Sequence, residues 1–307
     1  MRYRAFGATG IEVSEIGFGA WGIGGAYGAV SKRDAIDALA CAEDYGCNFV
    51  DSALVYGDAE AILGEFLVGR REKWIVATKY SGQTEGMRAT IERQLRLLRT
   101  DVIDFYQVHW YPRGAQEQLF EELANLKHEG KVRFAGVSLY SPTDIRDASR
   151  RADLDGFQVE HSLLEPNVML TAEPWVTPRL GVVVRSALAG GLLSGRYVPG
   201  TDFKDAGDQR AKWSREKVDR SLRAVEALRS VSDDLRALAI GYPLASEGVS
   251  TVIVGTKSAA QAKLNFGEPV KAPSRTELER ISRVQRELRL RSPWWYEALT
   301  RWKLRLA

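Results

Sequence analysis

The chain has 307 residues, 45% of them hydrophobic, which is enough to build the core of one large α/β domain. The formal net charge of +3 does not indicate a polyanionic partner, although residues 271–307 carry ten Lys or Arg against four Glu. We interpret that basic end as a solvated helix face rather than a nucleic-acid site. Two cysteines exclude a disulfide framework, and neither lies in a metal-ligand pattern. Because no apolar run resembles a signal peptide or could span a membrane, we expect a cytoplasmic protein without nucleic-acid or membrane partners.

The first predicted elements are a hairpin and a glycine-rich strand. Residues 2–6 and 11–13 flank Gly7-Ala8-Thr9-Gly10, a pattern that predicts a β-hairpin. The stretch 16–22 predicts the first strand of the main fold, in which glycine lets a ligand or another backbone approach closely. Ser31 is expected to cap a helix that ends at Gly46.

Strands and helices then alternate along the chain. Further strands are predicted at 48–51, 74–79, 102–109, 132–138, 156–160, 181–184 and 250–254. Helices are predicted at 61–68, 87–98, 116–128, 143–151 and 216–240, the last in one piece or two. The polar stretch 200–213 predicts a mobile loop.

This alternation predicts the fold class. Strict alternation indicates a parallel sheet, and eight strands in about this length fit a closed (β/α)8 TIM barrel. An open doubly wound sheet is the alternative, but the glycines between 17 and 25 do not take the spacing G-x-G-x-x-G that would mark it. We therefore predict one barrel domain over residues 1–307, with an N-terminal β-hairpin and a C-terminal helical extension.

Four polar side chains follow three successive predicted strands. Asp51 ends one strand and Tyr56 lies on the loop after it, while Lys79 and His109 end the next two strands. Each of them alone has a structural interpretation, such as packing or hydrogen bonding at a strand end. Since a parallel barrel directs the carboxyl ends of its strands to one face, we expect all four to converge.

The four groups suit proton transfer. A carboxylate can keep an ammonium charged inside a pocket, and the ammonium favours the ionised form of a neighbouring phenol. A neutral His109 could orient a carbonyl or share the proton. The set suits transfer of one proton to or from a carbinol oxygen. It does not suit hydrolysis, because no nucleophile is paired with a base, and it lacks the ligands of a metal site.

The segments 49–57, 77–79 and 107–110 resemble the catalytic stretches of the aldo-keto reductase superfamily, and the resemblance runs from about Arg2 to Phe266. It implies that Tyr56 is the general acid, that Lys79 and Asp51 lower its pKa, and that His109 steers the carbonyl. It also implies a nicotinamide cofactor as the hydride donor, since the protein has none of its own.

The same resemblance implies a set of cofactor-binding residues. Leu139 stands where an Asn usually contacts the carboxamide, and Arg185 stands where an aromatic residue often stacks on the nicotinamide. A planar guanidinium can also stack. Gln261 replaces a frequent Arg and leaves Lys257 to meet a 2′-phosphate, so NADPH is expected, with NADH possible. The implied residues are Trp21, Asp51, Ser138, Gln158, Arg185, Ser186, Leu188, Gly190, Gly195, Gly255, Thr256, Lys257, Gln261 and Asn265.

The substrate is expected to be a small-molecule carbonyl compound or sugar, in a pocket lined by Trp21, Tyr56, His109 and Trp110. The expected function is reduction of an aldehyde, ketone or sugar carbonyl. An NAD(P)-dependent sugar dehydrogenase working in the oxidative direction, or a cofactor-sensing regulatory subunit of the same fold, remains an alternative. The oligomeric state is open.

The tail after Pro293 predicts a helix with an aromatic stripe. Its members are Trp295, Ala298, Leu299, Trp302 and Leu306. This helix either docks on the side of the barrel or covers the mouth of the pocket.

Overall fold

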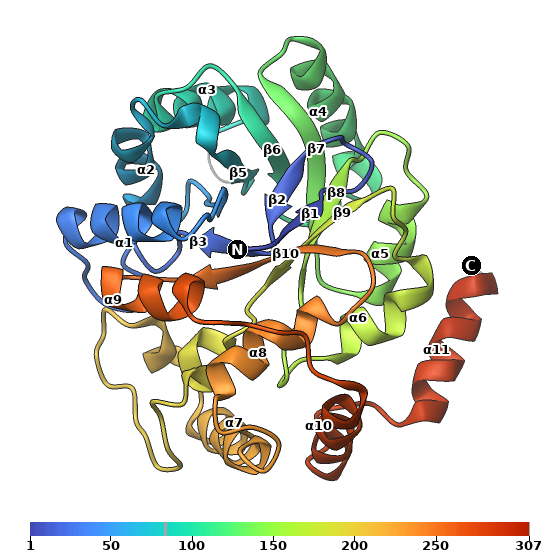
Figure 1. The fold of residues 1–307 in the computed structure, drawn as a ribbon. Helices are drawn as coiled ribbons and strands as arrows, with labels where there is room; N and C mark the ends of the chain where they lie inside the picture. Colours follow the sequence, from blue (N-terminus) through green and yellow to red (C-terminus); the bar gives the residue numbers. More distant parts are fainter. Residues whose placement is uncertain (83–84, 307) are drawn as a thin grey trace.

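The computed structural model describes residues 1–82 and 85–306, except for the side chains of Trp294, Trp295 and Leu306. Eight parallel strands close into a barrel in chain order, and the last strand pairs with the first (Figure 1). Its strands are β3 (Ile16–Gly19), β4 (Phe49–Asp51), β5 (Ile75–Tyr80), β6 (Ile103–Val108), β7 (Val132–Leu139), β8 (Gly156–Glu160), β9 (Gly181–Arg185) and β10 (Val249–Gly255).

Helices surround this barrel (Figure 1). They are α1 (Lys32–Asp44), α2 (Ala59–Leu67), α3 (Met87–Leu98), α4 (Gln118–His128), α5 (Pro142–Ser149), α6 (Asn167–Ala172), α7 (Arg215–Leu228), α8 (Leu235–Leu244), α9 (Ala259–Ala262), α10 (Arg275–Glu287) and α11 (Trp294–Leu306). Short helical turns are η1 (Arg71–Lys73), η2 (Gly114–Glu117), η3 (Glu173–Trp175), η4 (Ala189–Ser194), η5 (Gln209–Lys212) and η6 (Lys263–Gly267).

The predicted barrel, with its hairpin and terminal helices, is confirmed, and the elements differ from expectation mainly at their ends. The first barrel strand stops at Gly19 rather than at residue 22, and the predicted helix over 216–240 forms the two helices α7 and α8. The stretch 200–213, predicted as a mobile loop, contains a short regular element. This element is η5, and Gln209 donates its backbone N–H to the carbonyl oxygen of Ala26 at 2.9 Å.

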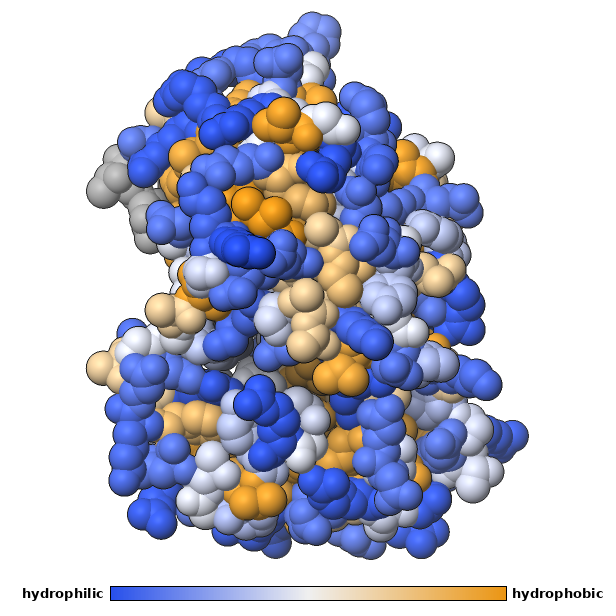
Figure 2. All heavy atoms as spheres, turned by 60° about the vertical axis from the view of Figure 1, so that its left-hand side comes forward, coloured by the Kyte–Doolittle hydropathy of each residue, from blue (hydrophilic) through white to orange (hydrophobic). Residues whose placement is uncertain are grey.

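Helix ends are set by local sequence. Ser31 accepts a hydrogen bond from the backbone N–H of Asp34, as its predicted capping role requires. Ser274 and Glu277 form a complete capping box at the start of α10. The outer faces of the helices are polar. Figure 2 shows that the face over α1 and α9 is mostly hydrophilic, with hydrophobic residues scattered among polar ones.

The N-terminal hairpin, β1 (Tyr3–Ala5) paired with β2 (Glu12–Ser14), leads into a plug at the amino-terminal end of the barrel. The plug is the ring of Phe6, which is fully buried at the turn of the hairpin. This ring packs edge-on against Phe105 at 5.0 Å between centroids and tilts toward Phe49 at 6.2 Å. The hairpin therefore closes the end of the barrel opposite to the predicted site.

Three glycines make room for these rings. Gly136, Gly156 and Gly181 are paired with one another across β7, β8 and β9. A Cβ at Gly181 would lie 2.6 Å from atoms of the Phe6 ring, and one at Gly136 would lie 2.3 Å from the ring of Phe105. The row of glycines, defined by these three residues, is a packing requirement of the plug.

The C-terminal helix α11 docks on the side of the barrel, which is one of the two expected positions. Arg301 donates to the backbone carbonyl of Thr171 in α6 at 3.2 Å, and Arg146 donates to the carbonyl of Leu304 at 3.0 Å. Leu304 is buried, whereas Leu299 and Trp302 are exposed. No described residue of α11 lines the cavity of the candidate site. Within the described ranges, no helix is long and apolar enough to cross a membrane.

Replacing Gly181 with Ala should destabilise the protein by about 1–3 kcal/mol, because the new methyl group collides with the buried ring of Phe6. Chemical denaturation would measure the change in the free energy of unfolding. Gly255→Ala is the matched control, since a Cβ there meets no atom within 4 Å and Gly255 also lies in a barrel strand. Adding Phe6→Leu, which replaces the ring with a smaller side chain, should recover part of the lost free energy of unfolding in the double variant. Equal stabilities of the Gly181→Ala and Gly255→Ala variants would contradict this account of the plug.

Candidate active site

The barrel brings the four polar groups of the sequence prediction to one end. Asp51 is the last residue of β4, and Lys79 lies near the end of the neighbouring strand β5. His109 directly follows β6, which is the next strand in the barrel, and Tyr56 lies on the loop after β4. Because the strands are parallel and adjacent, these side chains share one pocket at the carboxyl ends.

A buried ion pair lies at the centre of this group. Lys79 is fully buried, and its Nζ donates to Asp51 Oδ2 at 2.6 Å and to the backbone carbonyl of Ser52 at 2.7 Å. The second carboxylate oxygen of Asp51 accepts from Gln158 Nε2 at 2.8 Å and from Gln107 Nε2 at 3.3 Å. Burial is the largest single influence and lowers the pKa of Lys79, but the charges and hydrogen bonds of Asp51 and Tyr56 together outweigh burial and raise that pKa. Lys79 therefore stays charged inside the pocket.

A second layer of hydrogen bonds supports Lys79 from behind. Gln94 of α3 donates its Nε2 to the backbone carbonyl of Lys79 at 3.1 Å and to Glu60 Oε1 at 2.9 Å. Thr78 donates to the same oxygen of Glu60 at 2.6 Å, and Tyr106 donates to Gln94 Oε1 at 2.9 Å. All of these side chains are buried, so α2 and α3 fix the strand that carries Lys79.

The phenol of Tyr56 lies against the ammonium. Lys79 Nζ donates to Tyr56 Oη at 3.4 Å, which leaves the phenolic hydrogen free to point elsewhere. Burial raises the pKa of Tyr56, Lys79 acts in the opposite sense, and Asp51 adds to the rise. The net direction is upward, so the predicted effect of Lys79 holds, whereas Asp51 acts opposite to its predicted effect. The phenol is therefore protonated at neutral pH.

His109 is neutral in this environment. Burial lowers the pKa of His109 to about 4, and the charges of Lys79 and Arg185 act in the same direction. Its Nδ1 lies 3.1 Å from the hydroxyl of Ser81, a partner that sequence reasoning did not single out. The imidazole meets Tyr56 edge to face at 6.5 Å between centroids, so both rings border the same space.

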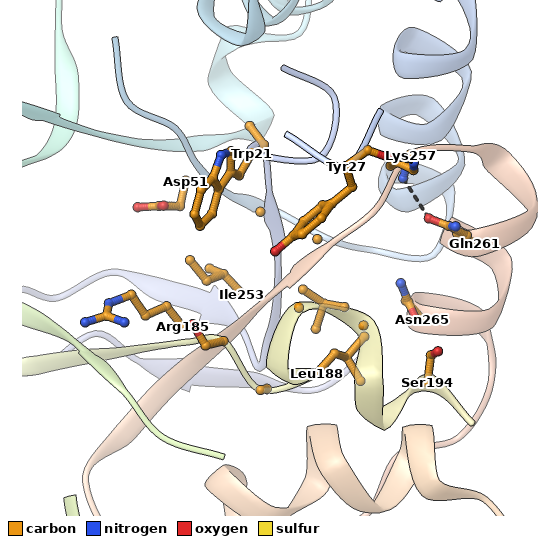
Figure 3. Close-up of a pocket in the computed structure, with 18 of the residues that line it drawn as sticks. Trp21, Tyr27, Asp51, Arg185, Leu188, Ser194, Ile253, Lys257, Gln261 and Asn265 are labelled. Carbon is orange, nitrogen blue, oxygen red and sulfur yellow. Dashed lines mark hydrogen bonds between the residues drawn. The ribbon is translucent and has the colours of Figure 1, made fainter. Parts of the chain in front are cut away.

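A cavity of about 810 Å³ extends from this group across the end of the barrel (Figure 3). In Figure 3, Asp51 and Arg185 lie at one end, and Lys257, Gln261 and Asn265 lie at the other. The predicted site residues that line it are Trp21, Asp51, Tyr56, His109, Gln158, Arg185, Ser186, Leu188, Gly190, Gly255, Lys257, Gln261 and Asn265. A cavity of this size and length suits a dinucleotide better than a small substrate alone.

Several predicted residues contribute without lining the cavity. Ser138 is buried next to Gln158 across the β7–β8 pairing, and Thr256 accepts a hydrogen bond from Asn265 Nδ2 at 3.0 Å. Gly195 ends η4 with a φ of +79°, a conformation that favours glycine. Trp110 turns away from the cavity. It packs against Tyr80 at 6.0 Å and donates its Nε1 to Gln116 Oε1 at 2.9 Å.

The floor of the cavity fits a carboxamide. Gln158 lines the cavity and Ser138 is paired with it across β7 and β8, and their buried oxygens Oε1 and Oγ have no hydrogen-bond partner among the described residues. A carboxamide carries a carbonyl oxygen that can accept from Ser138 and an amino group that can donate to Gln158. Leu139, which stands where an Asn is usual, is fully buried in the core. These two orphaned atoms are therefore the groups of this chain that would hold a nicotinamide carboxamide.

Arg185 borders the reacting end of the cavity. Its Nη1 donates to Glu160 Oε2 at 3.1 Å, and its guanidinium lies over the ring of Tyr140 at 4.7 Å. Its Nε is buried and has no partner among the described residues. Trp21 forms the opposite wall and stacks on Tyr56 with 5.6 Å between ring centroids.

The far end of the cavity carries cations that the sequence analysis did not single out. Lys257 was predicted there, and its Nζ donates to the backbone carbonyl of Tyr27 at 2.6 Å. Gln261 Oε1 accepts the backbone N–H of Lys257 at 2.9 Å (Figure 3). The lining residues that were missed include Tyr27, Val55, Tyr140, Arg196, Arg210 and Arg236. No metal-binding group of three or more His, Cys, Asp or Glu occurs in the part of the chain that the structure describes.

Comparisons with known proteins agree with this geometry. The family model described as "Aldo/keto reductase family" matches residues 15–284. L-galactose dehydrogenase of Arabidopsis thaliana is 31% identical over 306 residues, which cover 93% of this chain and 91% of that relative. Aldo-keto reductase YhdN of Bacillus subtilis is 28% identical over 286 residues, with coverage of 85% and 86%.

A solved structure also matches over most of the chain. The holo form of aldo-keto reductase AKR11C1 from Bacillus halodurans superposes with a TM-score of 0.75 at 27% identity, covering 92% of this chain and 96% of that one. Members of this family are oxidoreductases that generally use nicotinamide cofactors on small-molecule carbonyl compounds. The family model, the curated relatives and the fold agree, and this chain belongs to the aldo/keto reductase family.

Proposed function

We propose that this protein reduces the carbonyl of an aldehyde, ketone or sugar with NADPH, and that Tyr56 is the general acid. The observation that carries the proposal is the contact of a protonated phenol with a buried ammonium, in a site where Tyr56 and the neutral imidazole of His109 line one cavity. A bound nicotinamide cofactor would supply the hydride. Ser138 and Gln158 would hold its carboxamide, and Lys257 would meet its 2′-phosphate.

In this proposal each side chain has a separate task at the carbonyl oxygen. Tyr56 donates its phenolic proton as negative charge develops on that oxygen, and Lys79 stabilises the phenolate that remains. Asp51 keeps Lys79 charged. His109 is a neutral hydrogen-bond donor or acceptor that orients the carbonyl, and Trp21 and Tyr140 line the cavity around it.

Oxidation of a sugar alcohol by the same residues is the second candidate. In that direction the phenolate of Tyr56 would accept the alcohol proton, and Lys79 and Arg185 both favour this phenolate against the effect of burial. The relative L-galactose dehydrogenase carries a sugar dehydrogenase name. Initial rates in both directions, with a panel of aldehydes and of sugars, separate the two candidates.

Replacing Tyr56 with Phe should reduce the rate of carbonyl reduction by roughly 10²–10⁴-fold, because the variant retains the ring but lacks the proton donor. The dissociation constant of NADPH, measured by fluorescence titration, should change little. Tyr3→Phe is the matched control, since Tyr3 lies in the hairpin at the opposite end of the barrel. Near-normal turnover of the Tyr56→Phe variant would remove Tyr56 from the mechanism.

The pH profile of kcat/KM for reduction should be flat from roughly pH 6 to roughly pH 9. Activity needs the protonated phenol of Tyr56, whose pKa is raised above its ordinary value of 10.0, so the loss at high pH comes late. It also needs neutral His109, whose pKa is about 4, so the loss at low pH lies near that value. A limb with a midpoint between pH 6 and 8 would show that one of these two groups ionises differently.

Replacing Lys257 with Ala should raise the dissociation constant of NADPH about tenfold and leave that of NADH almost unchanged, because a charge-assisted contact to the 2′-phosphate is lost. Lys263→Ala, an exposed lysine nearby, is the control. Gln261→Arg should tighten NADPH by adding a second cation. If Lys257→Ala weakens both cofactors equally, the ammonium acts by holding the Tyr27 segment in place and not by reading the phosphate.

A further inference from the structure

Arg236 is a cavity residue that neither the sequence pattern nor the family resemblance marks. It lies in the first turn of α8 and lines the cavity together with Ser194 and Asn265. Helix α8 packs against η4, which carries Ser194, through a hydrophobic cluster that includes Leu193 and Leu235. In Figure 3, Ser194 and Asn265 lie far from Asp51. The guanidinium therefore belongs to the end of the cavity away from the reacting groups.

The hydrogen bonding of Arg236 is incomplete. Its side chain is 11% exposed, and Nη2 donates to Asp234 Oδ2 at 3.1 Å. Nη1 is buried and has no hydrogen-bond partner among the described residues. A buried charged donor without an acceptor is unfavourable, and native structures rarely keep one without a reason. An acceptor that arrives with a ligand would satisfy Nη1.

Among the other cations that line the cavity, Arg196 is exposed to solvent, and the remaining three are engaged by neighbouring groups or lie elsewhere. Lys257 donates to the carbonyl of Tyr27, and Arg210 is paired with Asp208 and lies over three aromatic rings. Arg185 also carries an unpaired nitrogen, but it lies at the reacting end and is paired with Glu160. Arg236 is thus the buried cation at the far end whose unused donor is available to an anion.

Building on the proposed function, we propose that Arg236 binds a phosphate group of the nucleotide cofactor. A guanidinium offers a planar fork of donors that matches phosphate oxygens, and such charge-assisted bonds are among the stronger ones in proteins. A dinucleotide brings two kinds of phosphate to this cavity, the 2′-phosphate on the adenosine ribose and the bridging pyrophosphate. Both share the chemistry that Arg236 recognises, and Arg236 would supplement Lys257 in holding this half of the cofactor.

The test is calorimetric titration of the full-length protein with 2′-AMP and with 5′-ADP, fragments that carry the two phosphates separately. Arg236→Leu should raise the dissociation constant of one of them by about tenfold or more, and the fragment that responds identifies the phosphate. Arg236→Lys retains the charge without the fork and should restore part of the affinity. If Arg236→Leu weakens 2′-AMP binding, it should weaken NADPH binding as well. If it weakens 5′-ADP binding, it should also weaken NADH binding.

Asp234→Asn should change the affinity for the fragment in the opposite direction to Arg236→Leu. Asp234 competes for the guanidinium, and its Oδ1 also accepts the backbone N–H of Ala237 at 2.9 Å as the cap of α8. An Asn retains that acceptor and removes the negative charge. The variant should therefore bind the responding fragment more tightly, by roughly twofold to tenfold.

Arg223→Leu, an exposed arginine on α7 that does not line the cavity, is the matched control for loss of a positive charge. Circular dichroism and thermal melting would show that each variant is folded. Unchanged dissociation constants for both fragments in a folded Arg236→Leu variant overturn the role of Arg236 and leave the proposed function standing. Failure of the wild-type protein to bind any of these nucleotides overturns the proposed function as well.

Discussion

The buried contact between Lys79 and Asp51 is the constraint on which the rest of the site depends. Two opposite charges out of contact with water are tolerated only where their remaining hydrogen-bonding capacity is met. Here the partners come from Gln107 on β6 and Gln158 on β8, and from the carbonyl of Ser52. Removing one partner would leave a buried charge uncompensated, so the closed order of the strands and the chemistry of the pocket depend on each other.

The ion pair also explains how a phenol and an imidazole can have well-defined protonation states in a desolvated pocket. Burial alone opposes every charged form, and this raises the pKa of Tyr56 and lowers that of His109. The positive charge of Lys79 lowers the pKa of Tyr56, and the carboxylate of Asp51 offsets that effect only in part. The pocket therefore presents a neutral donor and a neutral imidazole beside one retained ammonium, an arrangement that favours charge developing on a substrate oxygen.

The group around Lys79 and Asp51 was predictable from the sequence because the end of a buried strand is marked by a change from apolar to polar residues. Asp51, Lys79 and His109 each end an apolar run, and a parallel barrel converts that local pattern into proximity. The predicted lowering of the Tyr56 pKa by Lys79 is confirmed and that by Asp51 is wrong, and the net rise could not be predicted because the extent of burial depends on distant loops, Trp21 among them. Arg236 could not be found, since the start of α8 meets the cavity only after packing against η4. The short helical turn in the 200–213 stretch likewise depends on a distant contact, the hydrogen bond from Gln209 to the carbonyl of Ala26.

The plug at the other end of the barrel has a consequence for how the chain is made. Phe6 is synthesised before every strand of the barrel, yet the glycines that give its ring space lie on β7, β8 and β9. Proteins are synthesised from the amino terminus, and segments fold as their partners become available. The hairpin can therefore bury its aromatic ring against these glycines only after β9 has been translated. Closing this end of the barrel is thus a late event in biogenesis, although it uses a residue that precedes all eight barrel strands.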